Sequence, residues 1–572
     1  MKKRVFVLVL VAALIVTMMA GCAGGTASQT SAATTAASTT AASTAATTAT
    51  SSAASATATT AVATTAASGA TDSENFNETG YPIVKEPITV RAVFFESPDN
   101  NGKPEDMDQY KRLTEVTNVI FDWTFMDPSA EIKNLHFASG DLADFYNGAL
   151  TSDIINMYGV EGGLFQDISK LIYQYMPNMV ARFEEYPQAE KAIYEIDGAV
   201  YTLPWVMLGT TAADGRMFYR SDMLEDLGIE TPKTTTEFYD ACKTILDSGI
   251  TQGYSPILPG NGDGVGGYLM TYLFNAFGDS VDKEFADDGT GKVVYNYISD
   301  QYQRCIEYIR LLYADKLLEN EIYSLDADTV NARARAGQAA FVQNSGIYTS
   351  EDFADGIFHI DVIPPLTSEW NSTAKIKGYD CVSAVSGGIN KDCEYVREIL
   401  RYCDIAYAKD EVMIGTGLNA LAFNMGIKDE HYKVNAEDNT YEFILPDGYD
   451  GNAYTYLRLH YCWHYDFGIY DNFYFNKAPL NNAREKGMYY NNILYAVDPF
   501  PKGLLKMTED ESYSIASRYS DISNYVSQMQ AKFVTGVEPL DNWDQYVKEV
   551  NNMGIDQVLT VYQTAYDRWN SN

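Results

Sequence analysis

Residues 195–229 read EIDGAVYTLPWVMLGTTAADGRMFYRSDMLEDLGI, and this stretch is expected to join the two main parts of the fold. The pattern predicts a turn at Asp197-Gly198, strands at 199–203 and 217–219, and a helix from Ser221 to Gly228. Because proline lacks a backbone donor and restrains the residue before it, Pro204 is expected to mark the exit from the first sheet. Trp205 follows, at the kind of domain crossing where ligand pockets tend to lie. Trp205 is therefore a candidate ligand contact, with an ordinary buried position as the alternative.

The order of motifs in this stretch resembles extracellular solute-binding proteins of the carbohydrate-importer type, family 1. Asp-Gly, an aromatic residue and Leu-Pro at 197–204 precede an aromatic-Arg-x-Asp-x-Leu helix and Leu-Gly at 219–228, and then Pro-Lys-Thr at 232–234. In that family this segment leads from the first lobe to the second. The resemblance implies an α/β, two-lobe, periplasmic-binding-protein-like fold. Each lobe would hold a mostly parallel sheet flanked by helices, and the chain would cross between lobes two or three times.

The N-terminus predicts export and a lipid anchor. Lys2, Lys3 and Arg4 precede an apolar run at 5–16, and Met-Ala-Gly-Cys follows at 19–22. Residues 1–21 are thus a predicted signal peptide, and the small residues before Cys22 resemble the bacterial lipobox. That resemblance implies two or three acyl chains, such as palmitate, on Cys22, since one chain binds membranes only marginally. The alternative is a plain secretory signal with a coincidental cysteine.

Residues 22–78 are predicted to be a tether. Up to about residue 71 they are almost entirely Ala, Thr and Ser, with too little apolar bulk to offset the entropy of ordering. A flexible chain of about 50 residues reaches roughly 40 Å. We expect this lipid-anchored tether to hold the folded part at the extracellular face of a bacterial cell membrane.

Size, charge and composition restrict the partners. About 500 further residues exceed one hydrophobic core, so two lobes are expected, at 79–204 with 360–410 and at 205–359 with 411–572. The net charge of −36 repels nucleic acid and anionic membrane surfaces. The 43 tyrosines combine an apolar face with a hydroxyl, which suits sugar rings. The resemblance implies a mono- or oligosaccharide and ABC permease subunits as partners, and a monomer is expected.

Several predicted elements frame the candidate site. Strands at 88–95 and 120–126 flank a helix at 105–117, which predicts a parallel sheet in the first lobe. Thr234-x-x-Glu237 forms a capping box, and a long helix is expected from Asn390. Residues 359–365 (HIDVIPP) resemble the family's return to the first lobe at a double proline. A wide apolar stripe from Ile555 to Trp569 predicts a C-terminal docking helix.

The predicted ligand contacts come from the resemblance and from residues near the crossings. GDLADFYNG at 140–148 resembles a segment at the mouth of the family's cleft, which implies polar contacts from Asp144 and Asn147. Asp380, which follows the second expected crossing, is a third candidate polar contact. Loop capping is the alternative for Asp144. Stacking platforms are expected among Trp205, Tyr348, Trp370, Tyr379 and Trp463. Should the ligand carry uronic acids, Arg216, Arg220 or Arg458 would be its counter-charges.

Chemistry beyond binding is not expected. The cysteines form no CxxC pair and no ligand spacing with the five histidines, so no metal or cofactor is predicted. His460 and His464 have helical metal-ligand spacing but no HExxH context. No GxSxG, Walker A or Ser-His-Asp signature is found, which favours a binding protein that is not an enzyme. The alternatives are a secreted glycoside hydrolase or lyase and a surface ligand sensor of the same fold.

Overall fold

The computed structural model describes residues 74–96, 103–208, 217–259, 267–343, 359–378, 382–434, 441–449, 453–462, 466–471 and 494–571. All belong to one compact unit, Gly69–Asn572. The predicted signal peptide, Cys22 and nearly all of the tether lie outside the described residues. The helices that the structure describes include none long and apolar enough to cross a membrane.

The first sheet confirms the strand-helix-strand prediction. Its order is β13(Gly388–Ile389)-β3(Phe145–Asn147)-β1(Ile88–Phe94)-β2(Val119–Phe125), and β1 is parallel to both neighbours. Helix α2(Asp108–Thr117) connects β1 to β2 and buries Tyr110, Leu113 and Val116. Alternate side chains of β1 face two different apolar clusters, with Phe94 in one and Val93 in the other. This sheet is therefore covered on both faces, as parallel sheets usually are.

The second sheet has the order β10(Ile360–Ile363)-β5(Met217–Arg220)-β9(Phe341–Val342)-β6(Ile257–Leu258). β6 is parallel to β9, whereas β5 is antiparallel to both β9 and β10. Three strands thus share one direction and β5 is reversed. β5 is the first described element after β4 of the other sheet, and an antiparallel neighbour needs no helical crossover, so β5 need not share the direction of the other strands.

Helices cover the second sheet as the sequence predicts. α8(Ser221–Asp226) follows β5, and the capping box of Thr234 and Glu237 opens α9(Thr235–Ser248). α11(Asp300–Ala314) begins at Ser299, whose side chain accepts from the backbone N–H of Tyr302. The other helices and strands of this part are α10(Tyr268–Phe274), α12(Ala327–Arg335), β7(Phe285–Asp287) and β8(Val293–Tyr295).

Pro204 does not end a strand, contrary to the prediction. It lies inside β4(Leu203–Leu208), the central strand between β12(Val382–Ser386) and β16(Gly468–Asp471). Opposite Pro204, β12 has one extra residue: Ser383 pairs with Trp205 and Ser386 with Leu203. A bulge of this kind lets proline occupy a central strand although it has no N–H to donate. The expected strand at 199–203 is reduced to a bridge between Tyr194 and Val200.

The long helix predicted from Asn390 begins later, as α14(Val396–Asp404). Asn390 donates its backbone N–H to the carbonyl of Asp144, and its side chain accepts from the N–H of Asp392. These bonds hold Asn390 in an extended bridge with Phe165. Side-chain capping of a turn competes with helix initiation, which explains the shift.

Two main cores divide the unit, and the chain passes between them three times. The first passage leads from the first core at Val206 to the second core at Met217. The second leads back from Ile376 in the second core to Val382 in the first. The third leads from Ile469 in the first core to Phe500 in the second. Leu366 still packs in the second core, so the return crossing follows Ile376 and is not at Pro364-Pro365 as predicted.

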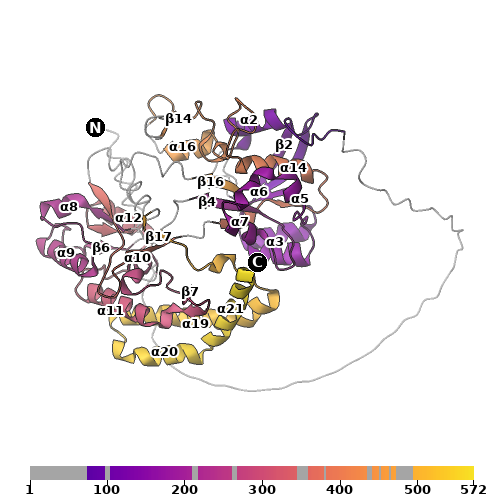
Figure 1. Ribbon diagram of the computed structural model, residues 1–572. Helices are drawn as coiled ribbons and strands as arrows, with labels where there is room; N and C mark the ends of the chain where they lie inside the picture. The colour runs from indigo at the N-terminus through magenta and orange to yellow at the C-terminus, as the bar shows by residue number, and fades with distance from the viewer. Residues whose placement is uncertain are drawn as a thin grey trace, which may run out of the picture. The chain divides into compact units, whose positions relative to one another are not determined.

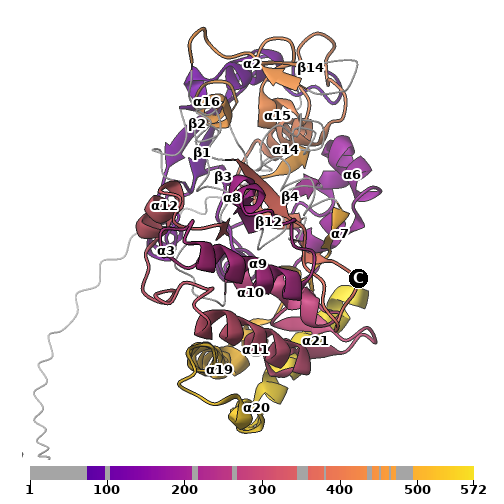
Figure 2. The same ribbon diagram turned by 90° about the vertical axis from the view of Figure 1, so that its left-hand side faces the viewer.

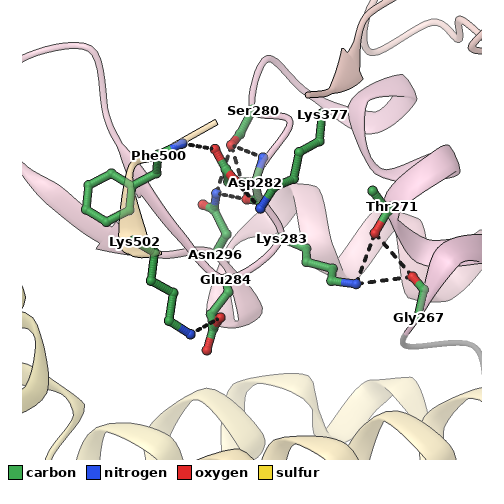
Figure 3. Close-up of polar contacts among 10 residues, drawn as sticks. All are labelled: Gly267, Thr271, Ser280, Asp282, Lys283, Glu284, Asn296, Lys377, Phe500 and Lys502. Carbon is green, nitrogen blue, oxygen red and sulfur yellow. Dashed lines mark hydrogen bonds and ion pairs between the residues drawn. The ribbon is translucent and has the colours of Figure 1, made fainter. Parts of the chain in front are cut away.

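A buried carboxylate holds two of the crossing segments together. β11(Ile376–Lys377) pairs in parallel with β17(Ala496–Val497). Asp282 accepts from Lys377 Nζ at 2.8 Å and from the backbone N–H of Phe500 at 2.8 Å (Figure 3). Asn296 and Ser280 hydrogen-bond the backbone of Asp282 and fix its loop. The ends of both crossing strands are thereby fastened to the second core.

Residues 405–469 contribute to the first core, although 411–572 were predicted to belong to the second lobe. Leu418, Phe423 and Phe467 pack with residues of β1 and β2. In Figure 2 the orange segments α14, α15(Ala422–Met425), β14(Tyr432–Val434) and α16(Ala453–His460) lie beside the indigo α2 and β2. Arg112 of α2 pairs with Glu430 at 2.9 Å, which agrees with this view. This packing favours drawing the boundary of the first lobe beyond residue 410.

The C-terminal helices are α19(Glu509–Thr535), α20(Trp543–Asn552) and α21(Ile555–Ser571). Figure 1 shows them in yellow along α11 and β7. Ile555, Val558 and Tyr562 are buried, which confirms the predicted stripe. The remaining named elements are α3(Ala130–Ser139), α4(Ser152–Ile154), α5(Leu171–Tyr175), α6(Pro177–Phe183), α7(Pro187–Ile193) and β15(Tyr441–Phe443), with a π-helical turn at Ile155–Glu161.

Candidate functional site

Asn147 stands at the carboxyl end of β3, where the neighbouring parallel strand β1 also ends. Its carbonyl accepts from the N–H of Phe95, the residue after β1. In open α/β sheets, ligands bind beyond the carboxyl ends of parallel strands. Side chains shared by these two strand ends are therefore the first place to look for a binding site.

The side chain of Asn147 is fully buried and held in one orientation. Its Oδ1 accepts from Ser386 Oγ at 2.6 Å and from the backbone N–H of Asp466 at 3.3 Å. The N–H of Asp466 is a donor only, so it identifies the amide oxygen and fixes the flip of the amide. The other amide atom, Nδ2, has no hydrogen-bond partner among the described residues. A buried donor without an acceptor costs about 1–3 kcal/mol, so Asn147 is ready to bind an acceptor.

Gly148 brings the backbone close to Asp466. A Cβ at Gly148 would lie 2.6 Å from Asp466 Oδ2 and 3.0 Å from the ring of Phe94, and its φ is +74°. Glycine is required here both for the backbone conformation and for the approach of the carboxylate. The N–H of Gly148 donates to Ser386 Oγ at 2.9 Å, which completes the local network.

Asp466 carries an unusual proton affinity. Burial, followed by the nearby charge of Glu96, raises the pKa of its carboxyl to about 6, and Arg458 opposes that shift. Arg458, on α16, has Nη2 3.8 Å from Glu96 Oε1. The Asn147 end of the sheet therefore holds two carboxyl groups and one guanidinium, and its charge changes between pH 5 and 7.

Trp205 lies in β4 next to this network. It pairs with Gly468 of β16, two residues after Asp466, and with Ser383 of β12. The side chain of Trp205 is half-buried, unlike the buried Val206 beside it. Ser386, which ends β12, and Asp466, two residues before β16, both hydrogen-bond Asn147, so the two strands paired with β4 connect Trp205 to the Asn147 network.

Two other predicted contacts lie elsewhere. Asp144 stands at the opposite end of β3, where Oδ2 accepts from the backbone N–H of Arg91 at 2.9 Å. Its carboxylate is thus used within the sheet, as the capping alternative expects. Trp370 is 53% exposed, and the guanidinium of Arg304 on α11 lies 4.1 Å from its ring centroid. The described contacts of Trp370 belong to the second core, so we leave both residues out of the candidate site.

Tyr348, Tyr379, Asp380 and Trp463 lie outside the described residues. Sequence reasoning missed Glu96, Ser386 and Asp466 as site residues. Glu96 lies two residues after β1 and Ser386 ends β12, so position at the end of a strand was the available signal for these two residues. Asp466 lies in the aromatic segment 459–467. In the part of the chain that the structure describes, no group of three or more His, Cys, Asp or Glu side chains is arranged to hold a metal ion.

A cavity of about 640 Å³ lies between α7 and α21 and contains none of the predicted site residues. Its lining includes Tyr194, Lys506, Arg568 and Trp569. Lys506 pairs with Glu195 and Arg568 with Glu511, so these cations are already neutralised. The Asn147 end, with its unpaired donor, remains the better candidate.

The comparisons with known proteins agree with the fold. The family model of the bacterial extracellular solute-binding proteins matches residues 121–398. The fructooligosaccharide ABC transporter substrate-binding protein FusA of Streptococcus pneumoniae serotype 4 is 24% identical over 519 residues, covering 86% of this chain and 92% of that protein.

Two solved structures share the arrangement over most of their length. The alginate-binding protein AlgQ2 gives a TM-score of 0.62 at 21% identity, covering 85% of this chain and 99% of that one. An HMO-binding, ABC-transporter-associated solute-binding protein from Bifidobacterium longum infantis gives 0.65 at 17% identity, covering 84% and 99%. With the two sheets and the three crossings, these likenesses lead to one conclusion: the chain has a periplasmic-binding-protein-like fold, and its residues 121–398 match the family model of the bacterial extracellular solute-binding proteins.

Proposed function

We propose that this protein captures a sugar or oligosaccharide between two lobes and delivers it to the permease of an ABC importer. The observation that carries the proposal is the Asn147 amide, whose oxygen is fixed by Ser386 and Asp466 while its Nδ2 meets no acceptor in the part of the chain that the structure describes. A sugar hydroxyl is an acceptor that fits this donor. The oligosaccharide-binding FusA and the HMO-binding protein support a sugar as the ligand class.

The two lobes of the proposal correspond to the two cores, with the first lobe extended to include residues 411–469. Three crossing segments join them, and β11 and β17 form the described part of the hinge. Closure about such a hinge would bury the ligand, as in other two-lobe binding proteins. The closed form would then be recognised by the permease subunits.

Aromatic stacking supplements the amide contact in this proposal. Trp205 offers its half-buried ring beside the Asn147 network. Tyr379, Asp380 and Trp463 remain proposed contacts because they adjoin described residues of this network in sequence: Val382 and Ser383 follow the first two, and Asp466 follows Trp463. Tyr348 is kept as the proposed stacking residue of the second lobe.

The anchor is part of the same proposal. Cleavage before Cys22 and acylation of its thiol would hold the protein at the outer face of the cell membrane, with the Ala/Thr/Ser tether as a leash of roughly 40 Å. Mass spectrometry of the protein from a native or heterologous bacterial membrane tests this directly. A mature N-terminus other than Cys22 carrying two or three acyl chains would contradict the lipid anchor and leave the binding function intact.

A thermal-shift screen over mono- and oligosaccharides, followed by calorimetry, tests the binding function. A ligand that binds only the native state raises the melting temperature by mass action. We expect at least one carbohydrate to do so and to be recovered unchanged after incubation. Absence of any shift across neutral and acidic sugars would overturn the proposal, and conversion of the sugar into products would indicate an enzyme instead.

A further inference from the structure

The charged groups of the described site distinguish between neutral and acidic sugars. Three arginines were candidates to neutralise a uronic acid, and Arg216 lies outside the described residues. Arg220 makes a bidentate pair with Asp222, with Nε and Nη2 at 2.7 and 2.6 Å from its two oxygens. The side chain of Arg220 is 9% exposed and that of Asp222 is 28% exposed, so the guanidinium is largely buried against this carboxylate. Arg220 is therefore committed to the protein's own carboxylate.

Arg458 has a similar commitment within the site. It lies 3.8 Å from Glu96 and also acts on Asp466, whose pKa its charge lowers against the larger effect of burial. One guanidinium thus faces two carboxyl groups. At neutral pH an anionic sugar ring would bring a third negative charge into a largely buried region, where charges are poorly screened.

The hydrogen-bonding groups favour the same ligand class. The unpaired atom of Asn147 is a neutral amide donor, which suits a hydroxyl or ring oxygen. A ligand carboxylate is typically bound by the two parallel N–H groups of an arginine guanidinium. Arg220 and Arg458 already have carboxylate neighbours within the protein. Asp466 lies against Gly148, directly beside Asn147, so it is placed to repel an anion bound there.

We propose that the Asn147 end of the first sheet binds an uncharged sugar ring, and that Asp466 and Glu96 make it reject uronic acids. This inference rests on the proposed function and names the substrate class of that site. Asp466 is the specificity-determining residue: repulsion selects against the wrong ligand while the Asn147 amide binds the right one.

The test compares matched ligands on the unaltered protein. Neutral fructo-, malto-, cello- and xylo-oligosaccharides are measured by calorimetry at pH 7.5 beside oligogalacturonides and alginate oligomers of equal chain length. We expect the best neutral ligand to bind at least 10-fold more tightly than any uronate. A uronate that binds more tightly than every neutral sugar would overturn this inference and leave the proposed function intact. Failure of all carbohydrates would overturn the proposed function itself.

Variants then test the assigned residues. Asp466→Asn should raise uronate affinity relative to neutral-sugar affinity at least 5-fold, and an unchanged ratio would remove Asp466 from this role. Asn147→Asp keeps acceptor oxygens for Ser386 and Asp466 but removes the donor, and it should weaken neutral-sugar binding at least 10-fold. Unchanged binding would mean that Nδ2 meets no ligand atom. Asp404→Asn, which removes a buried carboxyl on α14 elsewhere in the first core, is the matched control and should leave the ratio unchanged.

Discussion

Lys506 Nζ lies 2.6 Å from Glu195 Oε1, and this ion pair connects chain segments that belong to different cores. The neighbours of Glu195 in sequence pack in the first core, whereas Leu505, next to Lys506, packs in the second. The Glu195 side chain is 2% exposed, so the pair is shielded from water. Trp569 of α21 also packs against both cores. The C-terminal helix and this ion pair thus join the two cores outside the three chain crossings.

Removing one partner of this pair should be costly. Glu195→Gln leaves the Lys506 ammonium without its counter-charge in a buried place, and we expect a loss of about 3 kcal/mol in the free energy of unfolding. Chemical denaturation followed by tryptophan fluorescence measures it. Glu430→Gln, which breaks the more exposed pair with Arg112, is the control and should cost less than about 1 kcal/mol. Equal losses in the two variants would contradict the buried role of Glu195.

Asp282 should be equally sensitive, for a different reason. Its two oxygens hold Lys377 and the N–H of Phe500, which belong to separate crossing segments. Asp282→Asn retains one acceptor and loses the charge, so we expect a loss of about 2 kcal/mol in stability. Limited proteolysis should also cut the chain faster near 378–381. Proteolysis at the wild-type rate would show that Lys377 and Phe500 are held by other contacts.

The elements that could be predicted from sequence are those whose local patterns agree with their packing. The strand-helix-strand unit at 88–125, the capping box at Thr234 and the stripe of α21 each carry a period or a cap that tertiary contacts reinforce. Pro204 was misplaced because the bulge that accommodates it lies in β12, about 180 residues away in sequence. No local signal contains that information.

The candidate site was predicted only in part for the same reason. Asn147 was proposed from the resemblance of residues 140–148 to a cleft segment and Trp205 from its place after Pro204, and both stay predictions. Asp144, three residues from Asn147, accepts from the backbone N–H of Arg91 in β1. Ser386 and Asp466 reach Asn147 from segments more than 230 residues away. Their contribution depends on the pairing of β4 with β12 and β16, which a single sequence does not reveal.

Stability should depend on pH through Asp404. Burial raises the pKa of its carboxyl to about 6, against an unfolded value near 4, although the N–H groups of Asn178 and Met179 oppose the shift. The folded state therefore binds this proton more tightly, and its stability falls as pH rises from about 4 to about 6. Relative to wild type, Asp404→Asn should gain about 2 kcal/mol between pH 4 and pH 7, measured by urea denaturation. Asp127 is the opposite case, because hydrogen bonds from Ser129 lower the pKa of its carboxyl. The stability of Asp127→Asn relative to wild type should therefore fall as pH rises.

Trp205 and Trp370 provide the sharpest test of where the ligand lies. Trp205 is half-buried beside the Asn147 network, whereas Trp370 is exposed and stacks on Arg304 in the second core. Loss of stacking and apolar contact in Trp205→Ala should weaken ligand binding by about 1–3 kcal/mol. Trp370→Ala should leave calorimetric affinity within twofold of wild type. Circular dichroism of both variants establishes that they are folded. Unchanged affinity in Trp205→Ala together with a large loss in Trp370→Ala would move the ligand away from the ends of β1 and β3, because the aromatic surface used would then belong to the other core.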